Sequence, residues 1–169
     1  MVPNWLRTHR KARPTPLLRV LEIVEAVGRH VQDQLFAFTG SRAAAVPSYS
    51  SMADLLIGSY IWGLLEGYIR DTHDAKSVMG EEEIRATLSV AAPELCSRVF
   101  GPARAQWVRG QLPQWDGPPA YHLPFRRELS RMGLLGAHDG RCLAARDPLC
   151  FAKAGGLLAF LLDLAEPRV

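Results

Sequence analysis

The stretch from Met52 to Ile69, MADLLIGSYIWGLLEGYI, restricts the fold of this chain more than any other. Within it only Asp54 and Glu66 carry charge, and most of the remaining positions are apolar. A helix that is apolar nearly all round is buried, so we expect other helices to pack on it from several sides. Its three glycines are Gly58, Gly63 and Gly67. Because glycine disfavours a helix by about 1 kcal/mol relative to alanine, their presence indicates close approach of neighbouring backbones.

The same stretch is a poor candidate for a membrane span. Spans need about 20 consecutive apolar residues, whereas this segment is shorter and contains two carboxylates. The spacing of Gly63 and Gly67 occurs in membrane helix pairs, but it also suits a helix bundle in water. We therefore expect no membrane association, and a chain of 169 residues that forms one domain with its own core.

Helical patterns surround the central stretch. Thr15 and Pro16 supply an N-cap and a first-turn proline, and apolar residues then recur every three or four positions up to Gly40. Three glutamates at 81–83 complement the dipole at the start of another helix, which Pro93 is expected to interrupt. Further helices are expected at 93–100, 103–112, 125–132 and from 148 onward.

These patterns predict a mainly α fold, a single-domain bundle of six or seven helices that covers residues 15–169 around the buried helix 52–69. One segment differs. Between 134 and 144, two short apolar runs flank an Asp139-Gly140 pair, which is typical of a tight turn. A small β-hairpin is expected there.

Basic residues are concentrated at the start of the chain. Residues 1–14 form an arm that contains no acidic residue, with basic side chains at Arg7, Arg10, Lys11 and Arg13. Such an arm suits contact with phosphates, and it also suits a solvated terminus. Of the 20 basic residues in the chain, 17 are arginine, the better bidentate phosphate ligand. A GC-rich coding sequence would give the same bias.

The cysteines and the N-terminal residues bear on the compartment. Cys96, Cys142 and Cys150 form an odd set without paired spacing, so we expect no disulfide framework and a reducing cytoplasm. The charged start has no apolar stretch behind it, unlike a signal peptide.

Residues 86–99 resemble the helix-turn-helix of bacterial repressors. Ala86, the run Val90-Ala91-Ala92 and the run Ser97-Arg98-Val99 stand at the matching positions. The resemblance implies a turn at 90–92 and places Arg98 in a recognition helix. It departs at Val90, where the turn usually has glycine, and at Glu94, which would face phosphates.

Residues 104–144 resemble a winged-helix module. In FRRELSRMGLLGAHDGRCLA, a basic helix is followed by a Gly-Leu-Leu run that would enter the first strand of a two-stranded wing. The resemblance implies phosphate contacts from the helix and the wing tip, by Arg126, Arg127, Arg131 and Arg141. A long proline-rich loop between its two helices departs from the pattern. A surface helix and hairpin with solvated arginines is the alternative.

The proline-rich loop carries aromatic residues among arginines. Trp115 and Tyr121 lie in it, and Arg104 and Arg109 precede it. Aromatic faces between guanidinium groups suit stacking on unpaired bases, a protein interface, or the edge of a core.

Catalytic patterns are sparse. Glu66, His73 and Asp74 combine carboxylates with an imidazole near the end of the central helix, which suits a metal but equally a polar loop. The chain contains no phosphate loop, no G-x-S-x-G and no H-E-x-x-H. We therefore expect no cofactor, no metal and no enzyme activity.

The leading hypothesis is non-catalytic binding of nucleic acid, either by a DNA-binding regulator or by a small helical subunit of a nucleoprotein complex. The basic arm and the arginines of 98–141 would contact phosphates. The rival hypotheses are a protein assembly module, which uses the apolar last helix to bind a partner or a second copy, and a helical enzyme or ligand binder built on Glu66, His73 and Asp74.

Overall fold

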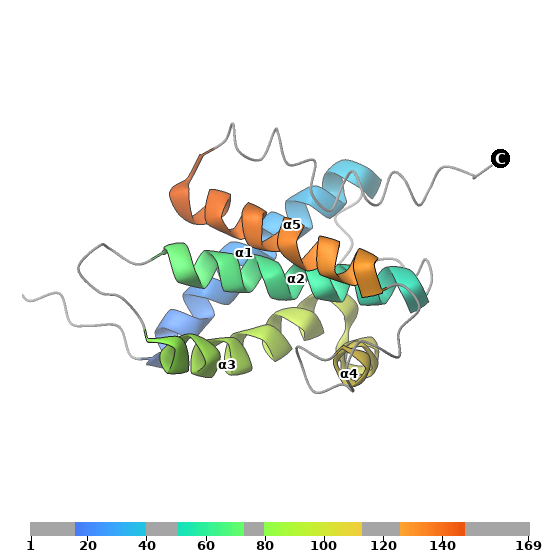
Figure 1. The fold of residues 1–169 in the computed structure, drawn as a ribbon, viewed down its shortest axis with the longest axis horizontal. Coiled ribbons are helices and arrows are strands. Elements are labelled where there is room, and N and C mark those ends of the chain that lie inside the picture. Colours follow the sequence, from blue (N-terminus) through green and yellow to red (C-terminus); the bar gives the residue numbers. More distant parts are fainter. Residues whose placement is uncertain (1–15, 40–50, 73–79, 113–125, 148–169) are drawn as a thin grey trace, which may run out of the picture.

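A computed structural model describes residues 16–39, 51–72, 80–112 and 126–147, and these residues form five α-helices (Figure 1). The helices are α1 (Pro16–Thr39), α2 (Ser51–Asp71), α3 (Glu81–Phe100), α4 (Pro102–Gln111) and α5 (Arg126–Ala145). The described part contains no strand, which confirms the mainly α fold. Within these ranges, no helix combines the length and the apolar character needed to cross a membrane.

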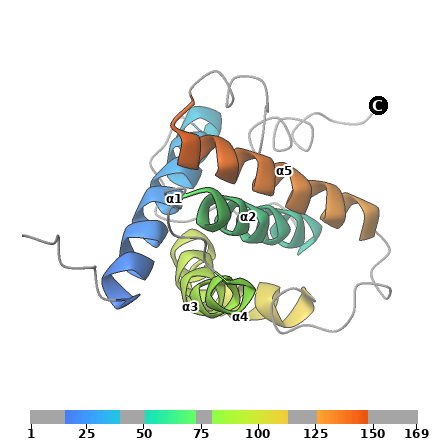
Figure 2. The ribbon, with the colours of Figure 1, turned by 60° about the vertical axis from the view of Figure 1, so that its left-hand side comes forward.

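Helix α2 occupies the centre of the bundle, as the sequence predicts. Fourteen of its residues are buried, including the whole run from Ala53 to Ile61. Figure 2 shows α5 on one side of α2, with α3 and α4 on the opposite side and α1 crossing near one end. A helix covered on several sides needs apolar residues around its whole circumference, which explains why the stretch lacks a polar face.

Helices α1 and α4, and the start of α3, lie where local sequence predicts them. Helix α1 starts at Pro16 and buries Val20, Val24, Val27 and Val31, whose spacing places them on one face. Three glutamates occupy the first turn of α3. Gly101, with a φ of 78°, ends α3, because this left-handed conformation suits glycine.

Two sequence predictions about α3 are wrong. The helix continues through Pro93 without a break, and residues 90–92 lie inside it, so the turn required by a helix-turn-helix is absent. Buried residues on both sides of the proline, among them Ala92 and Leu95, pack into the core. Their burial compensates for the one backbone hydrogen bond that the proline removes.

The predicted hairpin at 134–144 is also wrong, because the whole segment lies inside α5. The two-stranded wing of the winged-helix resemblance therefore has no counterpart there. The Asp139-Gly140 pair forms no turn, and both residues are buried against other helices. Tertiary packing has overridden the local turn preference.

Other predicted features lie outside the described residues. They are the basic arm of 1–14, the proline-rich loop with Trp115 and Tyr121, and the helix predicted from 148 onward.

Candidate nucleic-acid interface

The arginine predicted to read DNA from α3 is held by carboxylates of its own chain. The Nε of Arg98 lies 3.0 Å from Glu94 Oε1, and its Nη1 lies 3.4 Å from Glu25 Oε2 on α1. These ion pairs satisfy the guanidinium group and tie α3 to α1. The face of α3 that carries Arg98 therefore also presents carboxylates, which repel phosphate.

Arg104 on α4 has a structural role as well. Its guanidinium group donates to both carboxylate oxygens of Asp54, at 3.2 Å and 2.5 Å, and lies 5.3 Å from the centre of the Phe100 ring. Asp54 is buried, so removal of the arginine would leave a desolvated charge without its partner. Arg104 therefore joins α4 to the start of α2.

Arg109 is half-buried on α4. Burial raises the pKa of the nearby Cys96 thiol to about 12, and the positive charge of Arg109 partly opposes that rise. An arginine that lies partly inside the protein exposes little of its guanidinium group to an external ligand. Thus three arginines of the predicted site, Arg98, Arg104 and Arg109, face other groups of the protein.

The remaining four arginines of the predicted site that the structure describes are all on α5. Arg126, Arg127, Arg131 and Arg141 are exposed, and none of them forms an ion pair with another described residue. By contrast, ion pairs engage arginines of all the other four helices: Arg19, Arg29, Arg70, Arg98 and Arg104. Among the described residues Arg85 on α3 is also exposed and forms no ion pair, but α5 carries four such arginines, more than any other described helix.

Three of these arginines share one face of α5. With about 100° of rotation per residue, Arg127, Arg131 and Arg141 lie within one 80° sector of the helix. Leu134 lies in the same sector and is 74% exposed. The only acidic residues of the helix are Glu128, outside this sector, and Asp139, which is buried. The sector from Arg127 to Arg141, here called the α5 face, extends about 21 Å along the helix.

The opposite side of α5 packs on α2 at unusually short range. A Cβ atom on Gly63 would lie 2.8 Å from the carbonyl carbon of Gly133 and closer still to its oxygen. One on Gly136 would lie 2.9 Å from the amide nitrogen of Leu64, again with a carbonyl oxygen nearer. Real Cβ atoms essentially never come this close to other atoms, so the contact requires glycine at these positions.

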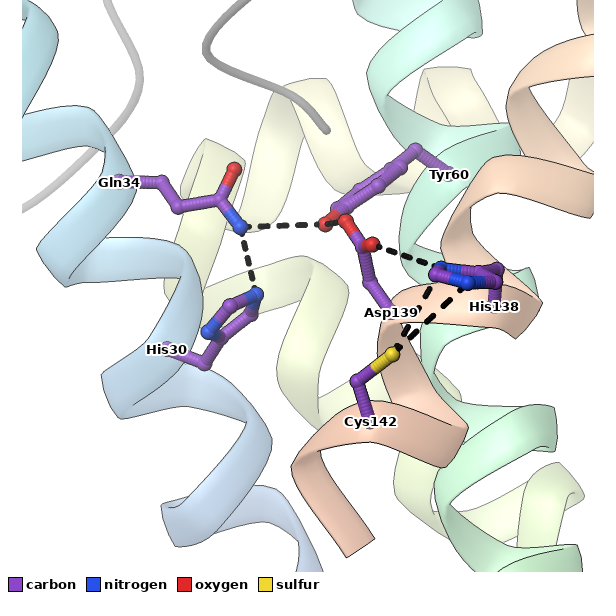
Figure 3. A network of polar contacts seen from close by, with 6 residues as sticks. All are labelled: His30, Gln34, Tyr60, His138, Asp139 and Cys142. Carbon is purple, nitrogen blue, oxygen red and sulfur yellow. Dashed lines mark hydrogen bonds and ion pairs between the residues drawn. The ribbon is translucent and has the colours of Figure 1, made fainter. Parts of the chain in front are cut away.

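A buried polar network crosses the same contact and reaches α1 (Figure 3). The hydroxyl of Tyr60, which is fully buried on α2, donates a 2.6 Å hydrogen bond to Asp139 Oδ2 on α5. Gln34 on α1 donates to the same hydroxyl at 3.2 Å, and its Nε2 lies 2.5 Å from Nε2 of His30. Three helices are therefore joined through one tyrosine hydroxyl.

On the solvent side of Asp139, His138 Nδ1 lies 3.4 Å from Asp139 Oδ1, and its ring is half-exposed beside Cys142 (Figure 3). Cys142 is itself disulfide-bonded, so the inference from the odd cysteine count against disulfides is wrong for this residue, and its sulfur is not a thiol. Burial lowers the pKa of His30, against the opposing charges of Asp139 and Asp33. The network thus contains a half-buried imidazole whose neutral form is favoured by burial, and it ties three helices together.

The described residues contain no group of three or more side chains suited to a metal ion. Glu66, which belongs to the enzyme hypothesis, accepts two hydrogen bonds from Arg70, while His73 and Asp74 lie outside the described ranges. The apolar last helix of the assembly hypothesis lies outside them too.

The glycines of the central stretch predicted close approach of neighbouring backbones, and Gly63 and Gly67 confirm this against α5. Sequence reasoning missed which helix would approach, and it missed the polar network. A usable indication was present, because Gly133, Gly136 and Gly140 recur at steps of three and four, the spacing of one helix face. Comparison with known proteins adds no assignment: no family model, curated protein or solved structure matches this chain.

Proposed function

We propose that the protein binds nucleic acid without catalysing a reaction, and that the α5 face makes the phosphate contacts. One observation carries the proposal. Four exposed arginines of α5 form no ion pair within the part of the chain that the structure describes, whereas most arginines of the other described helices are paired. An arginine in an ion pair must give up that partner to bind a phosphate, whereas Arg127 and Arg131 have no such partner among the described residues.

Rigidity of the helix supports the same assignment. The α5 face lies on a helix whose other side is fixed by glycine contacts and by the Tyr60–Asp139 hydrogen bond. Binding then requires ordering of the arginine side chains but not of the backbone, which reduces the entropic cost of association.

The test is fluorescence anisotropy with a labelled oligonucleotide at low ionic strength, followed by a salt titration. Affinity should fall steeply with salt, since each phosphate contact adds about 0.7–0.9 to the slope of log K against log salt concentration. The double variant Arg127→Ala/Arg131→Ala should bind roughly ten-fold more weakly. Its slope of log K against log salt concentration should decrease by the contribution of about two phosphate contacts.

A matched control separates a specific surface from general attraction. Arg29→Ala/Arg85→Ala also removes two positive charges, but from exposed positions on α1 and α3. It should leave affinity within about two-fold of the unaltered protein, because both arginines lie on other helices and not on the α5 face. Absence of binding at low salt would refute the proposed function. Equal losses in both double variants would refute the site.

A further inference from the structure

The position of α5 on the outside of the bundle indicates which class of nucleic acid would bind to it. Helix α5 packs on α2 and makes only slight contact with the other described helices. Figures 1 and 2 show it along the outside of the bundle, with α2 between it and α3. The α5 face is therefore the crest of a ridge and not the floor of a groove. A ridge fits a partner that is itself grooved.

The residues of α5 argue against unpaired bases as the main contact. Proteins that bind single strands combine basic residues with aromatic side chains on which the bases stack. The helix from Arg126 to Ala145 contains no phenylalanine, tryptophan or tyrosine. Its exposed apolar residue is Leu134, which offers a small aliphatic surface and no ring. The single exposed ring on α5 is the imidazole of His138, which is smaller than the aromatic rings that usually stack on bases.

Groove dimensions distinguish the two kinds of duplex. An α-helix with its side chains is about 10–12 Å across, and the major groove of B-form DNA is about 12 Å wide and 8.5 Å deep. The major groove of A-form RNA is deep and too narrow for side chains to read. Of the two major grooves, only that of the B-form duplex admits the crest of α5.

The distribution of residues around α5 matches such a groove. Taking Leu134 as the crest, Arg126 lies about 80° to one side and Arg131 about 60° to the other. Each could reach one of the two phosphate backbones that border a groove. Arg127 and Arg141 lie about 20° to either side of Leu134, near the two ends of the α5 face. Leu134 would then point to the groove floor, where the methyl group of thymine is the apolar feature.

We infer that the ligand is B-form double-stranded DNA and that α5 lies in its major groove, with arginines on both phosphate backbones and Leu134 against base edges. This inference rests on the proposed function and adds to it the form of the nucleic acid and the position of the helix.

The first experiment compares three labelled probes of one sequence at a single salt concentration: a 24-base-pair DNA duplex, its single strand and the corresponding RNA duplex. The DNA duplex should bind at least ten-fold more tightly than either of the others. If the single strand or the RNA binds as tightly, and the Arg127→Ala/Arg131→Ala variant still weakens binding, the proposed function stands and the inference fails.

The second experiment tests the groove. An alternating A·T duplex is compared with its counterpart in which deoxyuridine replaces thymidine, which removes only the methyl groups in the major groove. The unaltered protein should lose about four-fold in affinity, the effect of one buried methyl, and Leu134→Ala should show no difference between the duplexes. Val90→Ala, which truncates an exposed apolar side chain on α3, should keep the four-fold difference.

Two outcomes of the second experiment would overturn the inference: equal binding of both duplexes by the unaltered protein, or an unchanged difference in Leu134→Ala. Vesicles of phosphatidylserine and phosphatidylcholine serve as the competing anionic surface. Stronger retention on these vesicles than on DNA, lost in Leu134→Ala, would assign the α5 face to membranes instead.

Discussion

Replacement of Gly63 by alanine tests the packing that fixes α5 in place. In an isolated helix the substitution would stabilise by about 1 kcal/mol, because alanine is the better helix former. Here the new Cβ would meet the carbonyl group of Gly133, with the carbonyl carbon at 2.8 Å and the oxygen nearer. Ordinary van der Waals contact begins at 3.4 Å. Because the opposing atoms are backbone, relief requires the two helices to separate by roughly 1 Å.

That separation would affect more than the clash. Tyr60 bonds to Asp139 at 2.6 Å and Ser59 bonds to the carbonyl of Leu129 at 2.7 Å, both across the same pair of helices. A displacement of about 1 Å takes both beyond hydrogen-bonding distance, and each buried group left unsatisfied costs about 1–3 kcal/mol. With the gain in helix propensity subtracted, we expect Gly63→Ala to lower the free energy of unfolding by about 2–4 kcal/mol.

The assay is urea and thermal unfolding followed by circular dichroism. For a chain of this length, the loss corresponds to a decrease in Tm of roughly 5–15 °C. Gly110→Ala is the matched control, since a Cβ on this helical glycine meets nothing within 4 Å. It should be neutral or stabilising by up to about 1 kcal/mol. If Gly63→Ala is as stable as the unaltered protein, the close contact between α2 and α5 is refuted.

Three further predictions concern single groups. Burial lowers the pKa of His30 below its ordinary value of 6.5, so the unfolded chain binds the proton more readily than the folded protein. Stability should therefore be greatest above pH 6.5 and fall as the pH decreases, and the urea midpoints at pH 7.5 and 5.0 should differ less in His30→Gln than in the unaltered protein. Arg104→Ala leaves the buried Asp54 carboxylate without its partner and should destabilise by roughly 2 kcal/mol in urea, so an unchanged midpoint would contradict a structural pair. Burial raises the pKa of Cys96 to about 12, so iodoacetamide at pH 8 should modify it in urea but not in the folded protein, as read by mass spectrometry.

The helices that sequence predicts best are those with strong local patterns. The apolar run of 52–69 could hardly be anything but a central helix, and α2 buries nearly all of it. Helix α1 is equally well specified, because Pro16 marks its start and the valines follow the helical period. Neither prediction depends on knowing what the helix packs against.

Helix α5 shows where local patterns fail. The Asp139-Gly140 pair favours a turn in an isolated peptide. In the folded chain, Gly140 allows α5 to approach α2, and Asp139 binds the hydroxyl of a tyrosine 79 positions earlier. Both roles are defined by a partner helix, so no window of sequence around residue 140 contains the information. The same holds for Arg98 and Arg104, which pair with Glu25 and Asp54 on other helices.

The arginines of α5 were predicted as phosphate ligands from a helix followed by a hairpin, and the hairpin is wrong. The helix nevertheless places three of them on one face with Leu134. The reason lies on the buried side. Gly136, Asp139 and Gly140 can meet α2 in only one rotation of the helix, because a turn of 100° would replace a glycine with a side chain at a contact that admits none. That rotation directs Arg127 and Arg131 to solvent. The fit to α2 and the positive face are therefore one property of the sequence, and a substitution that forces α5 to rotate should weaken stability and polyanion binding together.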